Sequence, residues 1–419
     1  MVAQAVAVLS SFSVAFVVQA DFDYQCIART GDPYPTGGNY YSVNTRVAYE
    51  NGTVYFTGRP SSSSRYSILG QPLGGAGQIL VDNTMAVPGG TGTFYTLNTY
   101  APSVLNGAMA FYNQSSGSGT QRGIYLRAPN GELSCVVDRS YPMPNSSSTF
   151  GGIGRPGLTS DGVYFRATSL SGDQDGFFHA VNNQYTTIVD TSTVLPGTSS
   201  TLSAFGDFDV ENGRFAFYGG DEGSYRAIVS TTDMGATLEK HVDTLTEMPG
   251  YETWLFDSLG DPLIDQGNVA FRGQSARDGN NFRMEGIYGA VDGQLIKFVD
   301  KNTPNPGGGG FAEISGLRGY ENGIVLFSAE HDRTSTGDEG GVYYVLPDGS
   351  VHLLIEETQT LDGRVIEDMR SSALFGNTVI LNVGFTDGVI GLYAVTIPEP
   401  SSVTLLTLAA ATALLRRRR

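Results

Sequence analysis

The sequence has few of the side chains that most often carry enzyme chemistry. Its 419 residues include two cysteines and four histidines. The histidines are scattered along the chain, and no HExxH motif or pair four residues apart is present: His179, His241, His331 and His352. A Gly-x-Ser-x-Gly elbow and a phosphate-binding P-loop are also missing. Zinc, serine-nucleophile and nucleotide-phosphate chemistry therefore have no sequence motif in this chain.

Positive charge is scarce as well. The chain has 25 Lys and Arg against 42 Asp and Glu, a formal net charge of -17. A nucleic-acid-binding protein needs clustered Lys and Arg to displace counterions from phosphates, so this class is excluded. Charged residues make up only 16 % of the chain, while Gly contributes 55 residues and aromatics 11 %. This composition excludes disorder and long helices, and it predicts an all-β protein with many glycine turns.

Residues 1–20 carry no charged side chain and are largely apolar, with Val18 and Ala20 just before Asp21. An apolar stretch that ends in small residues predicts a secretory signal peptide, which is removed on export. The basic residues that usually precede such a stretch are missing. A buried first strand is the alternative interpretation.

The other end of the chain combines a short motif, an apolar run and a basic terminus. Pro398, Glu399 and Pro400 precede the apolar residues 403–415, and four arginines follow: Arg416, Arg417, Arg418 and Arg419. Thirteen helical residues reach roughly 20 Å, short of a ~30 Å hydrocarbon core, so we expect a short C-terminal apolar helix. The positive-inside effect would hold the arginines on the cytoplasmic side as a membrane stop.

This order of features resembles the PEP-CTERM tail of proteins that exosortase sorts in Gram-negative bacteria that make exopolysaccharide. The resemblance covers about the last 22 residues and implies that residues 398–419 are a sorting or anchor segment. It also implies two partners during export, an exosortase-type sorting enzyme and the membrane, followed by a cell-surface or extracellular location. An ordinary anchor that is never processed is the alternative.

Seven repeats occupy the chain between these ends. A glycine that opens an aromatic-ended strand recurs about every 54 residues, at Gly52, Gly107, Gly162, Gly213, Gly267, Gly323 and, in degenerate form, Gly376. A second glycine opens another strand, as in Gly123-Ile-Tyr125, and Asn130-Gly131, Asp292-Gly293 and Asp348-Gly349 predict two-residue hairpin turns. A third marker is an apolar pair followed by an acid, as in Val136-Val137-Asp138. A Pro or Gly turn then leads to the aromatic residue that begins the next unit, as at Phe94, Phe150, Phe205 and Phe311.

Four short strands per unit favour the blade of a β-propeller over a solenoid coil. The sequence therefore predicts a seven-bladed β-propeller over residues 21–397. The seventh unit lacks its fourth strand, because the chain reaches Pro398 soon after residues 391–396. Residues 24–29 resemble a fourth strand, so we expect this N-terminal strand to close the ring.

Three of the units share the form Gly-x-x-Ala-Phe, which begins at Gly107, Gly213 and Gly267. This form resembles the tandem NxxGxxAF repeat of anchored extracellular bacterial proteins, which often also carry a PEP-CTERM tail. Val104, Val210 and Ile264 stand three residues before these glycines in place of the leading Asn.

The repeat register places the two cysteines. Cys26 precedes Ile27 as Cys135 precedes Val136, so both occupy the same slot of an outer strand, two blades apart. A disulfide needs Cα atoms within about 7 Å, so we expect two free, buried thiols. The single Trp254 is expected to pack between blades.

Acidic residues give the one hint of a bound ion. Loops between the second and third strands contain Asp173-Gln-Asp175-Gly176, Asp221-Glu222, Asp278-Gly279 and Asp338-Glu339. These loops should share a face with the Pro-Gly turns, where Asp173 and Asp175 could hold Ca²⁺ through carboxylate oxygens. A solvated acidic surface is the alternative, and most of the excess acid is expected on the surface.

Three functions remain open. The first is a non-enzymatic, exported cell-surface or matrix protein whose propeller presents a binding face to exopolysaccharide or to a surface protein. The second is an extracellular propeller glycoside hydrolase or lyase, whose chemistry needs a pair of carboxyl groups at a suitable separation. The third is an envelope scaffold without a ligand.

Overall fold

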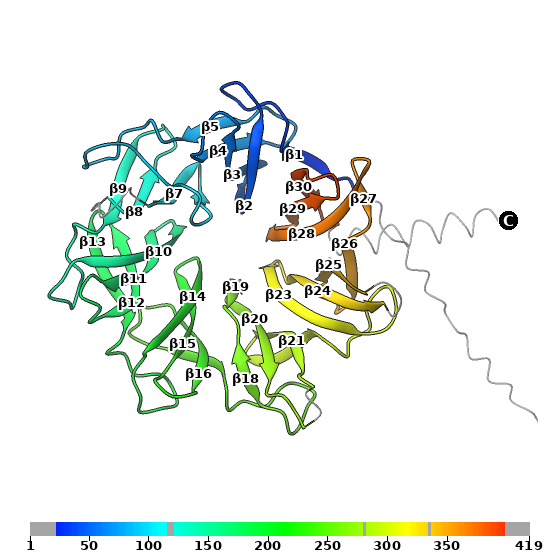
Figure 1. The fold of residues 1–419 in the computed structure, drawn as a ribbon. Coiled ribbons are helices and arrows are strands. Elements are labelled where there is room, and N and C mark those ends of the chain that lie inside the picture. The colour runs from blue at the N-terminus through cyan, green and yellow to red at the C-terminus, as the bar shows by residue number, and fades with distance from the viewer. Residues whose placement is uncertain (1–21, 115–120, 280–281, 334–336, 399–419) are drawn as a thin grey trace, which may run out of the picture.

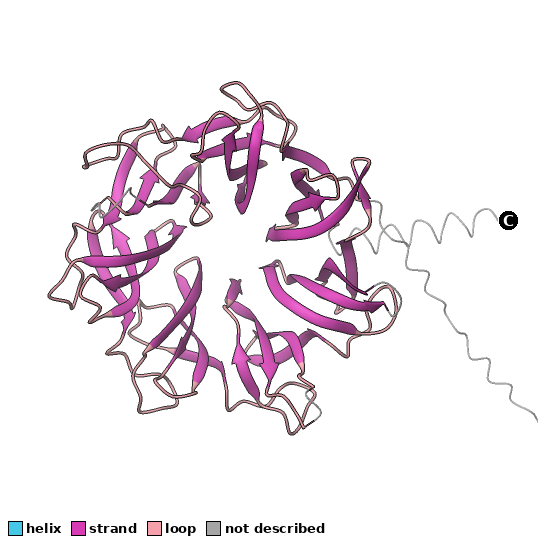
Figure 2. Ribbon diagram, in the orientation of Figure 1, coloured by secondary structure: helices cyan, strands magenta, loops and turns pink. Residues whose placement is uncertain are grey.

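The computed structural model describes residues 22–114, 121–279, 282–333 and 337–398. Every regular element in these ranges is a β-strand, joined by turns and loops (Figure 2). Within the same ranges no helix is long and apolar enough to cross a membrane. The signal peptide predicted for residues 1–20 and the C-terminal apolar helix predicted within residues 399–419 lie outside the described residues.

The strands form seven antiparallel sheets around one central axis (Figure 1), which confirms the seven-bladed β-propeller. Blade 1 contains β2 (Tyr40–Glu50), β3 (Thr53–Pro60), β4 (Ser67–Pro72) and β5 (Gln78–Val81). Blade 2 contains β6 (Ser103–Leu105), β7 (Ala108–Asn113), β8 (Gly123–Arg127) and β9 (Leu133–Asp138). Blade 3 contains β10 (Phe150–Thr159), β11 (Gly162–Ser169), β12 (Asp175–Val181) and β13 (Gln184–Asp190). Blade 4 contains β14 (Ala204–Glu211), β15 (Arg214–Gly220), β16 (Arg226–Thr231) and β17 (Glu239–Asp243).

The remaining three blades follow the same order. In blade 5 the inner position is shared by β18 (Phe256–Leu259) and β19 (Leu263–Asp265), followed by β20 (Asn268–Ser275), β21 (Glu285–Val291) and β22 (Gln294–Asp300). Blade 6 contains β23 (Phe311–Glu321), β24 (Ile324–Arg333), β25 (Gly337–Val345) and β26 (Val351–Glu356). Blade 7 contains β28 (Arg364–Phe375), β29 (Thr378–Phe385), β30 (Ile390–Thr396) and β1 (Gln25–Arg29), and β27 (Thr360–Leu361) pairs with β28.

The N-terminal strand closes the ring as the sequence predicts. Strand β1 pairs antiparallel with β30, with Cys26 opposite Tyr393 and Arg29 opposite Gly391. Chain segments more than 350 residues apart are thereby joined in one blade, and β30 is left with no open edge. Both cysteines are free, as expected, because each lies on the outermost strand of its own blade opposite a tyrosine, Cys135 facing Tyr125. The expected burial is wrong, because both cysteines are only half-buried on these outer strands.

Six of the seven glycines of the first marker lie in the tight turn between the first two strands of a blade, whereas Gly162 begins β11 directly after the turn. In blade 1, Asn51 and Gly52 have φ values of 46° and 77°, the left-handed backbone of a type I′ turn. Asp292-Gly293 forms the same turn, with φ values of 49° and 74°. The predicted two-residue turns at Asn130-Gly131 and Asp348-Gly349 are wrong. In each of these turns only the glycine has positive φ. Each turn also has three residues rather than two, because the N–H groups of Ala128 and Leu346 donate to the main-chain oxygens four residues later.

Two inner strands also differ from the expected pattern, and proline explains both differences. In blade 2 an isolated bridge joins Thr96 to Gln114, but the regular inner strand begins only at Ser103 rather than at Phe94, and Pro102 immediately precedes this strand. In blade 5, Pro262 separates β18 from β19. Proline has no N–H group for a ladder hydrogen bond, so pairing is interrupted at both positions.

Aromatic side chains from neighbouring blades fill the space between the sheets. Phe177 of blade 3 lies 5.1 to 5.6 Å, between ring centroids, from four rings of blade 4: Phe205, Phe208, Phe215 and Phe217. All five side chains are buried. Burial of each such ring stabilises the fold by roughly 1.5 to 3 kcal/mol, which explains why the aromatic markers recur with every blade.

The acid of the third marker ends the outermost strand and shapes the loop that follows. Asp300 is fully buried, and its Oδ1 accepts hydrogen bonds from Asn302 N and from Thr303 Oγ1. The same turn recurs at four other outer-strand ends: Asp82, Asp138, Asp190 and Asp243. These carboxylates are structural acceptors, so part of the acidic excess expected on the surface is buried instead.

Candidate functional site on the upper face

The alternation of strand directions gives the ring two different faces. We call the face that carries the connections between the second and third strands, and those from one blade to the next, the upper face. The tight turns within each blade form the lower face. Hydrogen bonds between the two kinds of upper loop, such as Gln121 Nε2 to Thr91 O and Ser146 Oγ to Asp173, confirm that these loops share one face.

Exposed hydrophobic side chains are concentrated on this upper face. Among the described residues, nine large hydrophobic side chains are exposed, and all except Val181 belong to the upper loops or to strand ends beside them. The eight are Tyr41, Tyr95, Leu170, Val194, Leu245, Leu255, Phe282 and Val365. Three of the eight are aromatic, Tyr41, Tyr95 and Phe282, and exposed hydrophobic side chains that gather on one face make that face the candidate site.

The first cluster on this face is the tyrosine–arginine patch, at the border of blades 1 and 2. It consists of Tyr41, Arg59, Arg65, Tyr66 and Tyr95. The guanidinium carbon of Arg59 lies 4.2 Å from the ring centroid of Tyr41 and 5.6 Å from that of Tyr66. That of Arg65 lies 4.7 Å from the Tyr95 ring. These cation–π contacts alternate flat rings with hydrogen-bond donors across the surface.

Two residues of the patch, Tyr41 and Arg59, lie on strands, and the other three lie in the loops beside them. Tyr41 is the second residue of β2, and Arg59 lies near the end of β3, where it pairs with Ser42. The Tyr66 hydroxyl donates to Ser42 Oγ at 3.2 Å, and Arg59 donates to the main-chain oxygen of Ser63 at 3.3 Å. Four consecutive serines, residues 61–64, add hydroxyl groups beside the rings.

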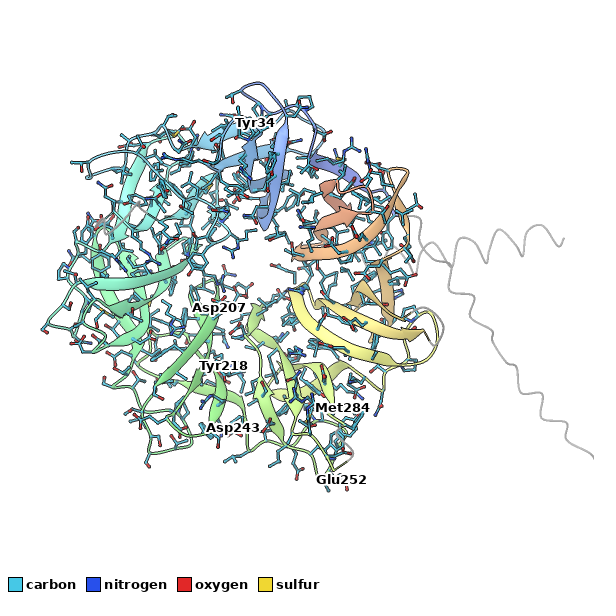
Figure 3. All side chains as sticks on the ribbon, in the orientation of Figure 1. Tyr34, Asp207, Tyr218, Asp243, Glu252 and Met284 are labelled. Carbon is cyan, nitrogen blue, oxygen red and sulfur yellow. The ribbon has the colours of Figure 1, made fainter. Side chains whose placement is uncertain are left out.

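The second cluster is the tryptophan patch, on the loops of blade 5. It consists of Tyr251, Trp254 and Phe282. The Tyr251 and Trp254 rings stack with centroids 5.7 Å apart and an interplanar angle of 23°, and Trp254 lies 5.7 Å from Phe282. Trp254 also packs against the buried cluster between blades 4 and 5, which confirms the expected packing between blades for one side of the ring. The residue as a whole is only half-buried. The loop lies at the outer rim of the ring, where Figure 3 labels Glu252.

The buried carboxylate of Asp300 supports the tryptophan patch from below. Its Oδ2 accepts hydrogen bonds from Tyr251 Oη at 2.6 Å and from Lys297 Nζ at 2.9 Å. Burial opposes ionisation of Asp300, but the hydrogen bonds from Lys297, Tyr251 and Thr303 outweigh it and lower the pKa. Burial and the bond to Asp300 raise the pKa of Tyr251 to about 12, so its hydroxyl stays a neutral donor.

Asp173 and Asp175, the residues predicted to hold Ca²⁺, lie close together but are occupied by protein groups. Asp173 accepts hydrogen bonds from the hydroxyls of Ser169, Ser171 and Ser146. Asp175 forms a two-pronged ion pair with Arg166, at 2.6 and 3.1 Å. Within the described ranges no group of three or more His, Cys, Asp and Glu side chains is placed to hold a metal ion.

Carboxylates on the inner strands link one blade to the next. Glu50 Oε2 accepts from Gly107 N at 2.8 Å, Asp209 Oδ2 from Ile264 N at 2.9 Å, and Asp265 Oδ2 from Gly323 N at 3.0 Å. In each pair the acid belongs to one blade and the N–H group to the next. From the sequence alone, acids that link two blades could not be distinguished from acids on a solvated surface.

A chain of polar contacts crosses three blades nearer the upper face. Arg155 Nε contacts Asp207 Oδ1 at 2.6 Å, and Asp207 N donates to Asp261 Oδ1 at 2.7 Å. Figure 3 shows Asp207 at the inner edge of blade 4 beside the central axis. Gly206 makes room for this contact, because a Cβ atom there would lie 2.9 Å from Asp261 Oδ1. Burial, and then the neighbouring Asp207, raise the pKa of Asp261.

Two serine–histidine pairs occur that the sequence motifs did not indicate, and neither has the geometry of a catalytic triad. Ser230 Oγ lies 2.8 Å from His241 Nε2, but Ser230 is buried. Ser350 Oγ lies 2.8 Å from His352 Nε2 and also 2.6 Å from Asp348 Oδ1. In a triad the carboxylate orients the histidine, whereas here it contacts the serine, in a lower-face turn.

Solved structures with a similar fold include the propeller domain of a protease and two hydrolases. The β-propeller domain of the Trilobed protease from Pyrococcus furiosus, described as having an open velcro topology, matches with a TM-score of 0.52 and 9 % identity, covering 85 % of this chain and 95 % of that one. A puromycin hydrolase matches at a TM-score of 0.50 and 11 % identity, covering 82 % of this chain and 50 % of that chain. A prolyl endopeptidase matches at a TM-score of 0.50 and 11 % identity, covering 90 % of this chain and 49 % of that chain.

This chain spans about half the length of the hydrolase and endopeptidase chains, and these likenesses show the fold alone. No curated protein matches the chain. A family model described as a family of unknown function, DUF7453, matches residues 8–404.

Proposed function

For this chain, which belongs to the DUF7453 family of unknown function, we propose a non-enzymatic role as an exported cell-surface or matrix protein whose upper face binds neutral polysaccharide. The observation that carries the proposal is the placement of exposed rings. Eight of nine exposed large hydrophobic side chains in the described ranges lie on the upper face, and the aromatic ones belong to the two patches.

The chemistry of the patches suits sugars with equatorial hydroxyl groups. A β-linked glucan presents flat C–H faces, which pack against tyrosine and tryptophan rings, and a rim of hydroxyls that need donors and acceptors. Arg59, Arg65 and the serines of residues 61–64 supply such donors and acceptors beside Tyr41 and Tyr95.

Charge favours a neutral chain over an acidic one. The protein carries a formal net charge of -17, so a polyanion approaching the ring would be repelled at moderate ionic strength. Lys297 and Lys301 lie over the Tyr251 and Phe282 rings of the tryptophan patch. Both are already paired, because Lys297 contacts Asp300 and Lys301 lies 3.8 Å from Glu285.

The first and last strands of the described chain both meet the lower face at their free ends. Strand β30 ends on the lower face at Thr396, and Ile397 N donates to Asn377 O at 2.8 Å in the turn there. Strand β1 begins on the same face, since Gln25 pairs with Ala394 near the end of β30. If an exosortase-type enzyme or a membrane holds the C-terminal segment, the lower face is directed toward that enzyme or membrane. Both patches, on the upper face, are then directed away from it.

The hydrolase alternative receives less support from these contacts. The inner-strand carboxylates Glu50, Asp209 and Asp265 cap main-chain N–H groups of the next blade. Acids in such positions stabilise the ring, and moving one to protonate a glycosidic oxygen would break a contact between blades.

Affinity electrophoresis tests the proposal. Native gels would contain hydroxyethylcellulose or galactomannan as neutral chains, and alginate as the acidic one. We expect the neutral chains to retard the wild type and the lower-face control Val181→Ala equally. A variant with Tyr41→Ala, Tyr95→Ala, Trp254→Ala and Phe282→Ala should migrate freely. Retardation of this variant like the wild type, or no retardation of the wild type by either neutral chain, would overturn the proposal.

A further inference from the structure

The two aromatic patches lie on opposite sides of the ring. Tyr41 belongs to β2 of blade 1, whereas Trp254 lies just before β18 of blade 5. Figure 1 places β2 to β5 across the central axis from β18 to β21. In the tryptophan patch the rings contact one another, and in the tyrosine–arginine patch Tyr41 and Tyr66 share Arg59 while Tyr95 contacts Arg65. Among the residues that the structure describes, no ring or cation–π contact joins the two patches.

From this arrangement we infer that one copy of the protein binds two separate segments of neutral polysaccharide, one at each patch, and so bridges polysaccharide chains. The inference rests on the proposed function and extends it from binding to cross-linking. A ligand segment that stacks on Tyr41 and Tyr95 is too far round the ring to stack also on Trp254, so the patches act as independent sites.

Both patches are fixed to the same rigid body, which a bridge requires. The tyrosine–arginine patch is held by β2 and β3, through the pairing of Ser42 with Arg59. The tryptophan patch is held by the bond from Tyr251 to the buried Asp300. Closure of the ring by β1 and β30 fixes their relative position. Two sites on a rigid body convert weak single contacts into strong attachment to long chains.

The tryptophan patch suits the same class of ligand as the first patch. Phe282 is 39 % exposed and Leu255 is 43 % exposed beside the half-buried Trp254, so the indole lies at the edge of an open aromatic surface. Thr253, Glu252 and Asn302 surround this surface with hydrogen-bonding groups. A flat apolar platform with a polar rim and no unpaired lysine fits a neutral sugar face.

Separate variants of the two patches test the inference. Tyr41→Ala with Tyr95→Ala removes one platform, and Trp254→Ala with Phe282→Ala removes the other. In titration calorimetry with cellohexaose we expect about two binding sites per wild-type chain and about one in each double variant. With long hydroxyethylcellulose, the wild type should raise the viscosity, whereas each double variant should bind without raising it.

The outcomes separate this inference from the function on which it rests. One site per wild-type chain, with loss of binding in only one double variant, would refute bridging and leave polysaccharide binding intact. Absence of cellohexaose and hydroxyethylcellulose binding in the wild type would refute both. A rise in viscosity that persists in both double variants would place the bridge elsewhere and overturn the inference. If Trp254→Ala lowers the thermal midpoint, Phe282→Ser alone replaces it, since that side chain is not buried.

Discussion

The hydroxyl of Tyr251 donates a hydrogen bond of 2.6 Å to the carboxylate of Asp300, which has no exposed surface. Tyr251 belongs to the loop that enters blade 5, and Asp300 ends the outermost strand of the same blade. A related contact joins Asn145, in the loop entering blade 3, to Asp190 at the end of that blade's outermost strand, at 3.3 Å. The buried acids therefore connect the loops of the upper face to the sheets beneath them.

Replacement of Asp300 by alanine tests this connection. The change leaves Tyr251, Lys297 and Thr303 without their acceptor, so we expect a loss of about 2 to 4 kcal/mol in the free energy of unfolding. The exposed Asp257 of β18 is the matched control, and Asp257→Ala should change stability by no more than about 0.5 kcal/mol. Chemical denaturation measures both values. Equal losses in the two variants would show that the Asp300 contacts are dispensable.

The inner-strand acids predict an unusual pH dependence of stability. Burial, and then the carboxylates of Asp265, Asp209 and Glu211, raise the pKa of Glu321 from its usual 4.5 to about 7. At a pH between these two pKa values, Glu321 holds a proton in the folded chain but has released it in the unfolded chain. Stability therefore falls as the pH rises through this window, and the loss is complete above pH 7.

The variant Glu321→Gln tests this dependence. Glutamine cannot ionise but can still accept from the Gly376 N–H group that Glu321 contacts. We expect the variant at pH 8 to be more stable than the wild type by about 1 to 2 kcal/mol, and the difference to shrink toward pH 5. Thermal midpoints across this range provide the measurement. A constant difference at all pH values would rule out titration of Glu321 as its cause.

Ring closure makes the N-terminal strand essential for stability. Ile27 of β1 is 5 % exposed and packs in a cluster with Phe56 and Leu69 of blade 1 and Leu392 of blade 7. Ile27→Ala should cost about 2 to 4 kcal/mol, because it leaves a cavity where the ring closes. Leu170→Ala, on a side chain that is 59 % exposed, should cost less than about 0.5 kcal/mol. Similar midpoints for the two variants would mean that the ring does not depend on this closure.

Much of the fold could be predicted because the repeat reflects local physics. Gly52 and its equivalents occupy turns that need positive φ, and Phe177 and its equivalents fill the gap between blades, so both recur with the blade period. The patches could not be predicted in this way. Tyr41 and Arg59 break the repeat and meet only through folding, as do Arg65 and Tyr95. The extra tyrosine after Tyr40 and the serine run before Arg65 were the available signals.

Export and sorting make a separate prediction for the ends of the chain. Protein recovered from the native cell should lack most of residues 1–20 and be cut or anchored near Pro398, Glu399 and Pro400. Intact-mass measurement checks both changes. Recovery of the full-length chain from the cytoplasm would contradict the proposed route, while the polysaccharide-binding experiments would still stand on their own.

The most direct test of the central claim is to find which face of the ring a polysaccharide covers. Hydroxyl-radical footprinting with hydroxyethylcellulose, read by mass spectrometry, reports the solvent exposure of each reactive side chain. We predict lower oxidation of Tyr41, Tyr95, Trp254 and Phe282 in the presence of the polysaccharide, and unchanged oxidation of Val181 on the lower face. Protection of Val181 with unchanged upper-face rings, or no protection on either face, would contradict the account.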